Sequence, residues 1–197
     1  MRTPVVALLV LVSLSAGLAS VRAQTACPES RSSFDTCQIA APECPDRVGV
    51  RQFGTAGEDL QLGSRCADTQ RGGAGNDTQR GSSGDDRQYA GAGNDTIDGG
   101  TGSDLESAGD GNDLVDGRAG ADSLLGGAGL DVLSGGAGSD RLTGGPSRDS
   151  LSGGAGNDTI SARDGATDSI QCGTGRDRVV ADRDDRVSRN CESVTRR

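Results

Sequence analysis

Residues 54–161 repeat every nine residues without a break in phase. The last unit reads GGAGNDTIS, and eleven variants precede it, beginning with GTAGEDLQL. Tandem units in register are typical of a solenoid, because each copy buries its apolar side chains only against its neighbours. Composition excludes an ordinary layered core, since Gly fills 33 positions and aromatic residues make up 2% of the chain.

Each unit divides into a turn and a strand. The first and fourth positions are mostly Gly, which we expect to supply the positive φ angles of a six-residue turn. The last three positions predict a short strand whose middle residue faces inward, between polar neighbours. Two units would close one coil, so that odd units stack in one parallel sheet and even units in the other. The apolar inward residues are Ile97, Val115, Leu124, Leu133, Leu142, Leu151 and Ile160.

The sixth position is Asp in every unit, and no other position is invariant. Turn chemistry alone accepts Asn or Ser, so the unbroken column indicates a role for the carboxylate itself. The alternative is a metal-free solenoid whose Asp side chains only satisfy backbone groups of the turns. The twelve residues are Asp59, Asp68, Asp77, Asp86, Asp95, Asp104, Asp113, Asp122, Asp131, Asp140, Asp149 and Asp158.

The pattern resembles the GGxGxDxUx nonapeptide of the RTX (repeats-in-toxin) hemolysin-type calcium-binding family. The resemblance implies an all-β fold, a right-handed parallel β-roll or β-solenoid. It also implies that Asp carboxylates and backbone carbonyls hold Ca²⁺ between turns one coil apart. Cys66 and Ser147 replace the turn Gly at position four, which puts Asp68 and Asp149 outside the expected set. The expected metal ligands are Asp77, Asp86, Asp95, Asp104, Asp113, Asp122, Asp131, Asp140 and Asp158.

Calcium is also expected to control folding. Neighbouring coils of a parallel solenoid lie about 4.8 Å apart, so stacked carboxylates repel one another. Calcium takes six to eight oxygen ligands in adaptable geometry and would neutralise these columns. Its binding free energy would then become folding free energy.

The first four units depart from the apolar rule at the inward position. They carry Gln61, Gln70, Gln79 and Gln88 there, and Glu106 follows. One interpretation is a Gln ladder across the two sheets or a recognition surface. The other, which we favour here, is a poorly packed N-terminal half that needs covalent support, because unpaired buried amides are costly.

The chain divides into four segments. Residues 1–23 have the basic start, apolar run and small-residue end of a signal peptide, with an uncleaved anchor as the alternative. A Cys-rich N-terminal cap over 24–53, the β-roll over 54–161, and degenerate repeats with a C-terminal cap over 162–197 are expected to follow. The last segment would be a flexible charged tail if it did not form a cap.

Six cysteines in an exported chain indicate disulfides. Cys172 with Cys191 is the preferred bridge, and we expect both caps to be stapled in this way. The first four cysteines admit three pairings that the sequence cannot choose between: Cys27, Cys37, Cys44 and Cys66.

Several functional classes are disfavoured. The net charge of -9 argues against nucleic acid and anionic membranes as partners. Without His, neither a Ser-His-Asp triad nor an HExxH metal motif can form, so we do not expect an enzyme. The leading prediction is a secreted, extracellular calcium-binding repeat protein acting as a structural or interaction module. An adhesion or ice-binding surface is the alternative, and a carboxylate-based hydrolase is less favoured.

Overall fold

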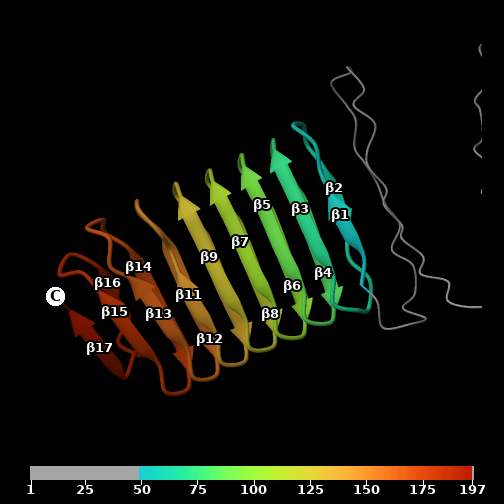
Figure 1. Cartoon of the computed structure of the whole chain (residues 1–197). Coiled ribbons are helices and arrows are strands. Elements are labelled where there is room, and N and C mark those ends of the chain that lie inside the picture. The colour runs from blue at the N-terminus through green and yellow to red at the C-terminus, as the bar shows by residue number, and fades with distance from the viewer. Residues whose placement is uncertain (1–48, 197) are drawn as a thin grey trace, which may run out of the picture.

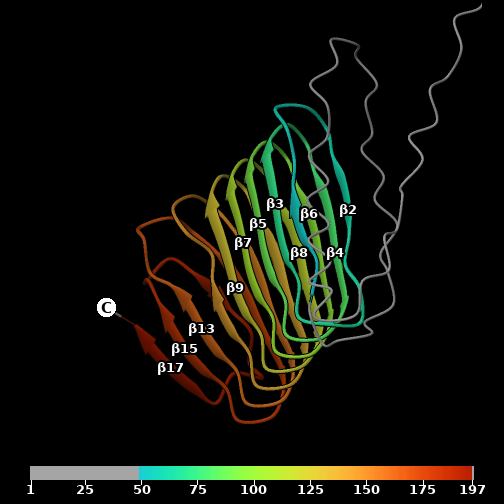
Figure 2. The same ribbon diagram turned by 45° about the vertical axis from the view of Figure 1, so that its right-hand side comes forward.

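The computed structural model describes residues 49–196, which form a flattened coil of parallel strands. The expected leader, nearly all of the expected N-terminal cap, and Cys27, Cys37 and Cys44 lie outside this range. Two sheets face each other, and consecutive strands alternate between them (Figures 1 and 2). The expectation of an all-β parallel solenoid is confirmed. Within residues 49–196, no helix has the length and apolar character needed to span a membrane.

The odd-numbered strands make the nine-stranded sheet and the even-numbered strands the eight-stranded one. The nine-stranded sheet contains β1 (Arg51–Phe53), β3 (Thr69–Ala74), β5 (Arg87–Ala92), β7 (Leu105–Asp110), β9 (Ser123–Ala128), β11 (Arg141–Thr143), β13 (Thr159–Ala162), β15 (Arg178–Ala181) and β17 (Ser193–Arg196). The eight-stranded sheet contains β2 (Leu60–Leu62), β4 (Thr78–Ser83), β6 (Thr96–Thr101), β8 (Leu114–Ala119), β10 (Val132–Ala137), β12 (Ser150–Ala155), β14 (Ser169–Thr174) and β16 (Arg186–Val187).

The strand register follows the predicted two-unit coil. Val132 pairs with Ser150, and the same 18-residue step relates the other neighbouring strands of the regular array. The step becomes 19 residues between Ser150 and Ser169, because the turn over 162–168 has one residue more than the others. The sequence therefore places each unit in the correct sheet.

Most strands are twice as long as predicted. A typical strand such as β6 has six residues, because it continues through the first three positions of the following unit. The tight part of the turn is correspondingly shorter. Strand β11 stops at Thr143, three residues before Pro146, which has no backbone N–H to donate to a ladder.

The glycine prediction is correct at position four and wrong at position one. Positive φ angles occur at positions two and four, as in Gly91 (φ 122°) and Gly93 (φ 138°). First-position glycines such as Gly81 lack a positive φ and are needed for space instead. A Cβ at Gly81 would lie 2.3 Å from Oδ2 of Asp86.

The interior is a stack of single side chains from position eight. All seven predicted apolar residues are at most 1% exposed, and Ile170 and Val179 continue the stack into the last coils. Ala90 and Ala108, at position one, are also fully buried. The inward orientation of position eight is thus confirmed.

The expected poor packing of the early units is wrong. In the first ladder, Gln70 Nε2 donates to Gln52 Oε1 at 2.8 Å and Gln88 Nε2 to Gln70 Oε1 at 2.9 Å. A second ladder joins Gln79 Nε2 to Gln61 Oε1 at 2.7 Å. Each of these Gln side chains also donates to a carbonyl of the opposing sheet. The buried amides are stable here because both amide hydrogens of Gln70, Gln79 and Gln88 find acceptors, and Gln52 and Gln61 each donate to one carbonyl.

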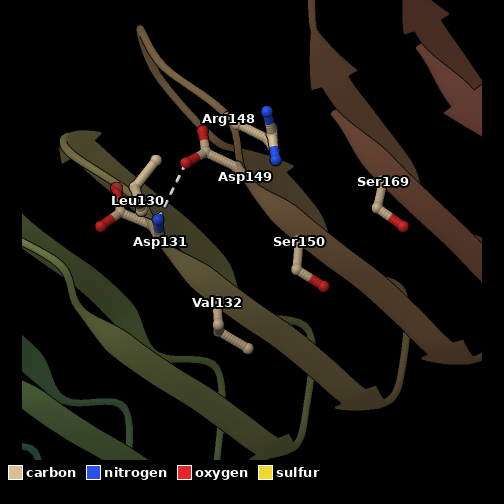
Figure 3. Close-up of a pocket in the computed structure, with 7 residues that line it drawn as sticks. All are labelled: Leu130, Asp131, Val132, Arg148, Asp149, Ser150 and Ser169. Atoms are coloured by element: carbon tan, nitrogen blue, oxygen red, sulfur yellow. Dashed lines mark hydrogen bonds between the residues drawn. The ribbon is translucent and has the colours of Figure 1, made fainter. Parts of the chain in front are cut away.

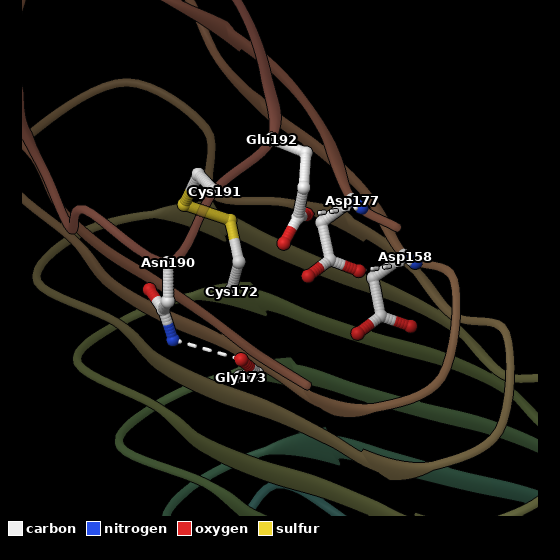
Figure 4. The surroundings of a disulfide bond; sticks show 7 residues. All are labelled: Asp158, Cys172, Gly173, Asp177, Asn190, Cys191 and Glu192. Carbon is white, nitrogen blue, oxygen red and sulfur yellow. Dashed lines mark hydrogen bonds between the residues drawn. A yellow bond between two sulfur atoms is a disulfide. The ribbon is translucent and has the colours of Figure 1, made fainter. Parts of the chain in front are cut away.

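The Cys172–Cys191 disulfide is confirmed and joins the last two coils (Figure 4). Asn190 Nδ2 donates to the carbonyl of Gly173 at 2.9 Å beside it. Cys66 is also disulfide-bonded, and its partner lies outside the described residues, so the pairing of the first four cysteines stays open.

Candidate metal centre

The position-six Asp side chains form two straight columns, one along each edge of the solenoid. Every member is at most 4% exposed. Each Oδ1 from Asp77 onward accepts a hydrogen bond from the backbone N–H of the Asp one coil earlier, over 2.7–3.0 Å. These bonds fix each carboxylate in the same orientation from coil to coil.

From Asp77 onward, the second oxygen of each position-six carboxylate is buried and has no hydrogen-bond partner. It faces the space beside the first-position glycine, where a carbonyl of the next coil also points. A Cβ at Gly135 would lie 2.5 Å from Asp140 Oδ2 and 2.6 Å from Gly153 O. At Gly126 the same point is 2.5 Å from both Asp131 Oδ2 and Gly144 O. Oδ2 and a carbonyl oxygen of the next coil therefore lie close together at these two glycines, and no described donor bonds Oδ2.

A comparison of Asp with Asn at position six shows whether these oxygens suit a cation. An Asn in place of each Asp would keep the Oδ1 acceptor and direct N–H donors toward the carbonyl. The Asp column instead presents oxygen to oxygen, which is unfavourable unless a cation or proton lies between them. Calcium prefers oxygen ligands from carboxylates and carbonyls, so the residues present fit it.

The carboxyl groups resist ionisation without a cation. Burial, followed by the charges of neighbouring Asp residues, raises the pKa of Asp77 to about 7 and that of Asp86 to about 8. The backbone hydrogen bond to each carboxylate opposes this shift only in part. A bound divalent cation supplies the positive charge that the ionised column requires.

All nine residues predicted as ligands have an unpartnered buried Oδ2, although Ala90 and Ala108 replace the first-position glycine in the units of Asp95 and Asp113. Asp68, which the prediction left out, differs from them. Its carboxylate accepts hydrogen bonds from Ser64 N, Ser64 Oγ and Val50 N, so its oxygens serve the backbone. Asp68 therefore lacks the orphaned oxygen of the nine.

Asp149, also left out of the prediction, has the same geometry as the nine. Its Oδ1 accepts from Asp131 N at 2.9 Å, and its Oδ2 is unpartnered (Figure 3). Ser147 takes a positive φ of 101° at the position of the missing Gly, which keeps the turn in shape. The exposed side chains of Leu130 and Val132 line an open surface pocket next to these two carboxylates.

The columns extend beyond the regular repeats, which the nine-residue phase did not reveal. Asp168 and Asp185 continue one column, with Oδ1 of each accepting from the preceding member at 2.8 and 2.9 Å. Asp177 and Glu192 continue the other, as Figure 4 shows at the C-terminal end. The available signal was an acidic residue directly before a short strand, as in TDSI and RDRV.

Position five serves the turns and not the candidate site. Asn76 Oδ1 accepts from Asn94 N, and Asn94 Oδ1 accepts from Asn112 N, both at 2.8 Å. These side chains are exposed and form a second ladder on the outside of the turns. They explain the Asn residues of this position without any ligand.

Glu106 is the one charged side chain at position eight of the regular units. It is completely buried, and neither carboxyl oxygen has a hydrogen-bond partner. Burial, followed by the charges of Asp122 and Asp104, raises its pKa to about 9. Its register partner in β5 is Gln88, whose Oε1 is also unpartnered.

Comparison with known proteins gives a family match over the same coils. The model of the RTX calcium-binding nonapeptide repeat (4 copies) matches residues 71–106, 107–142 and 134–168. No curated protein and no solved structure matches the chain. The matched residues contain the Asp columns and the orphaned oxygens described above. Through residues 71–168, the chain belongs to the RTX calcium-binding nonapeptide repeat family, whose repeats bind Ca²⁺.

Proposed function

We propose that this protein is an exported calcium-binding module whose array folds when calcium binds, and that it serves a structural or interaction role outside the cell. The observation that carries the proposal is the row of buried Asp Oδ2 atoms that face carbonyl oxygens. In this arrangement the carboxylates orient the turns through Oδ1 and leave Oδ2 for the ion. The Cys172–Cys191 disulfide supports an oxidising compartment.

The proposed ligands are the nine predicted Asp residues together with Asp149. The first-position carbonyls close to Oδ2, such as Gly144 O and Gly153 O, would complete part of each coordination shell. A catalytic role is not proposed, because each Asp side chain repeats the same backbone-bonded geometry and none is set apart as an acid or a base.

Circular dichroism with and without a calcium chelator tests the coupling to folding. We expect a strand-rich spectrum with calcium and loss of most strand signal after chelation, since the ionised columns then repel. Isothermal titration should detect calcium uptake over the same concentration range. A spectrum unchanged by chelation, together with no calcium uptake, would refute the proposal.

A matched pair of neighbouring substitutions tests the ligands. Asp86→Asn keeps the Oδ1 acceptor but removes the orphaned Oδ2 oxygen, so fewer calcium ions should bind and the folding midpoint should move to higher calcium concentration. Asp85→Asn is the control, because Asp85 accepts Ser103 N on the exposed side, where other turns carry Asn. Equal calcium titrations for the two variants would exclude Asp86 as a ligand.

A further inference from the structure

Three carboxylates converge at the stretched turn near the C-terminal end. Asp149, Asp164 and Asp168 each place a carboxylate oxygen within 4.8 Å of the other two. Across residues 49–196, this is the one place where three such groups approach so closely. Asp149 and Asp168 are consecutive members of one column, whereas Asp164 belongs to the turn over 162–168 with its additional residue.

Two of the three side chains are buried and incompletely bonded. Asp149 is 2% exposed and Asp168 is 1% exposed, and Oδ2 of each lacks a hydrogen-bond partner. Their Oδ1 atoms are already used, since they accept the backbone N–H of Asp131 and Asp149 respectively. The second oxygen of each is therefore left without a hydrogen-bond partner and could contact a ligand.

Hydrogen bonds to Asp182 and within its own turn hold Asp164 at this place. Its backbone N–H and that of Gly165 both donate to Asp182 Oδ2, at 2.9 and 2.7 Å. Its Oδ1 accepts from Ala166 N at 2.6 Å. Asp164 is exposed, so water can reach the site and supply ligands that the protein does not.

We propose that Asp149, Asp164 and Asp168 form a distinct cation site that binds Ca²⁺ more tightly than the regular turns. The inference rests on the calcium-binding function proposed above and adds a ranking among its sites. Calcium affinity rises with the number of charged ligands, and no regular turn in the described part of the chain brings a third carboxylate to its pair.

Calcium titration of the whole chain by equilibrium dialysis, starting at submicromolar free calcium, tests the site. We expect the native chain to bind one ion ahead of the rest. Asp164→Asn should weaken binding of this first ion about tenfold, since it removes one ligand charge but retains the Oδ1 acceptor. The weaker ions and the circular dichroism spectrum at saturating calcium should not change.

Asp110→Asn is the matched control. Asp110 is an exposed carboxylate at the end of strand β7, at position three of a unit of regular length, and lies outside any three-carboxylate group in residues 49–196. Its substitution should leave the first binding step unchanged. Identical titrations for Asp164→Asn, Asp110→Asn and the native chain would overturn this site while leaving the proposed function intact. Absence of any calcium uptake by the native chain would refute both.

Discussion

At the scale of single residues, each Asp carboxylate divides two tasks between its two oxygens. Oδ1 ties one coil to the preceding one, and Oδ2 faces a carbonyl oxygen without a donor between them. Asn could also tie the coils together through its Oδ1. In a metal-free protein its amide would suit the place of Oδ2 better, because it could donate to the carbonyl oxygen. The strictness of the column is therefore explained by the second oxygen, which only a cation or a proton satisfies.

Glu106 allows this reasoning to be tested inside the core. Glu106→Gln should raise the free energy of unfolding of the calcium-loaded protein by about 1–2 kcal/mol. The new amide would extend the Gln52–Gln70–Gln88 ladder by donating to Gln88 Oε1, which now lacks a partner. It would also remove a buried carboxyl group. Denaturant unfolding at saturating calcium measures the change.

The reverse substitution, Gln88→Glu, is the control and should destabilise the protein, because it places a second carboxyl group beside Glu106 and removes a donor to Gln70. A Glu106→Gln variant less stable than the native chain would contradict this account. It would show that the Glu106 carboxylate has a favourable partner of its own.

At the scale of the elements, the turn at Ser147 holds a strained backbone. Ser147 has a φ of 101°, which L-residues other than Gly rarely adopt. Ser147→Gly should therefore stabilise the calcium-loaded protein by about 1 kcal/mol, measured by thermal or denaturant unfolding. Ser152→Gly, in strand β12 of the same unit, should instead destabilise it. Equal effects of the two substitutions would show that the turn at Ser147 is unstrained.

The elements also show what the sequence could and could not predict. Alternation around Ile97 or Leu133 identified the inward residue, because one side of such a strand must be apolar. It could not reveal that β6 or β10 continues through Gly and Ala, since these residues have no side-chain pattern and pair through the backbone alone. For the same reason, the first-position glycines were expected to adopt a positive φ. They are instead required because a Cβ would not fit there.

The candidate site was predictable to a similar degree. Phase alone located the nine proposed Asp ligands, each of which has an unpartnered buried Oδ2. It could not locate Asp164, because that residue joins Asp149 and Asp168 only through a turn that breaks the phase. The turn at Ser147 and the packing at Gln70 are more regular than the sequence suggested. A Ser can adopt the required φ, and a Gln amide can reach both a neighbouring Gln and the opposing sheet.

At the scale of the whole molecule, the columns make metal-free folding depend on pH. Burial raises the pKa of Asp77 and Asp122 to about 7 and that of Asp86 to about 8 in the folded chain. An unfolded Asp titrates near 3.9, so between about pH 4 and 8 the folded state binds more protons. Its stability without calcium should therefore increase as pH falls through this window.

With chelator present, circular dichroism should show more strand at about pH 5.5 than at about pH 8. With limiting calcium the dependence should reverse, because protons and calcium compete for the same oxygens. A chelated chain that gains strand content as the pH rises would contradict the raised pKa values of the columns.

The 18-residue step of the regular array has a consequence for how such a molecule can change in size. Adding or deleting one whole layer would join surfaces that are already complementary, so the rod could lengthen or shorten without redesign of its remaining contacts. An indel of one or two residues must be absorbed inside a single bend, as the segment over 162–168 demonstrates. The regular array can therefore gain or lose length only in whole coils.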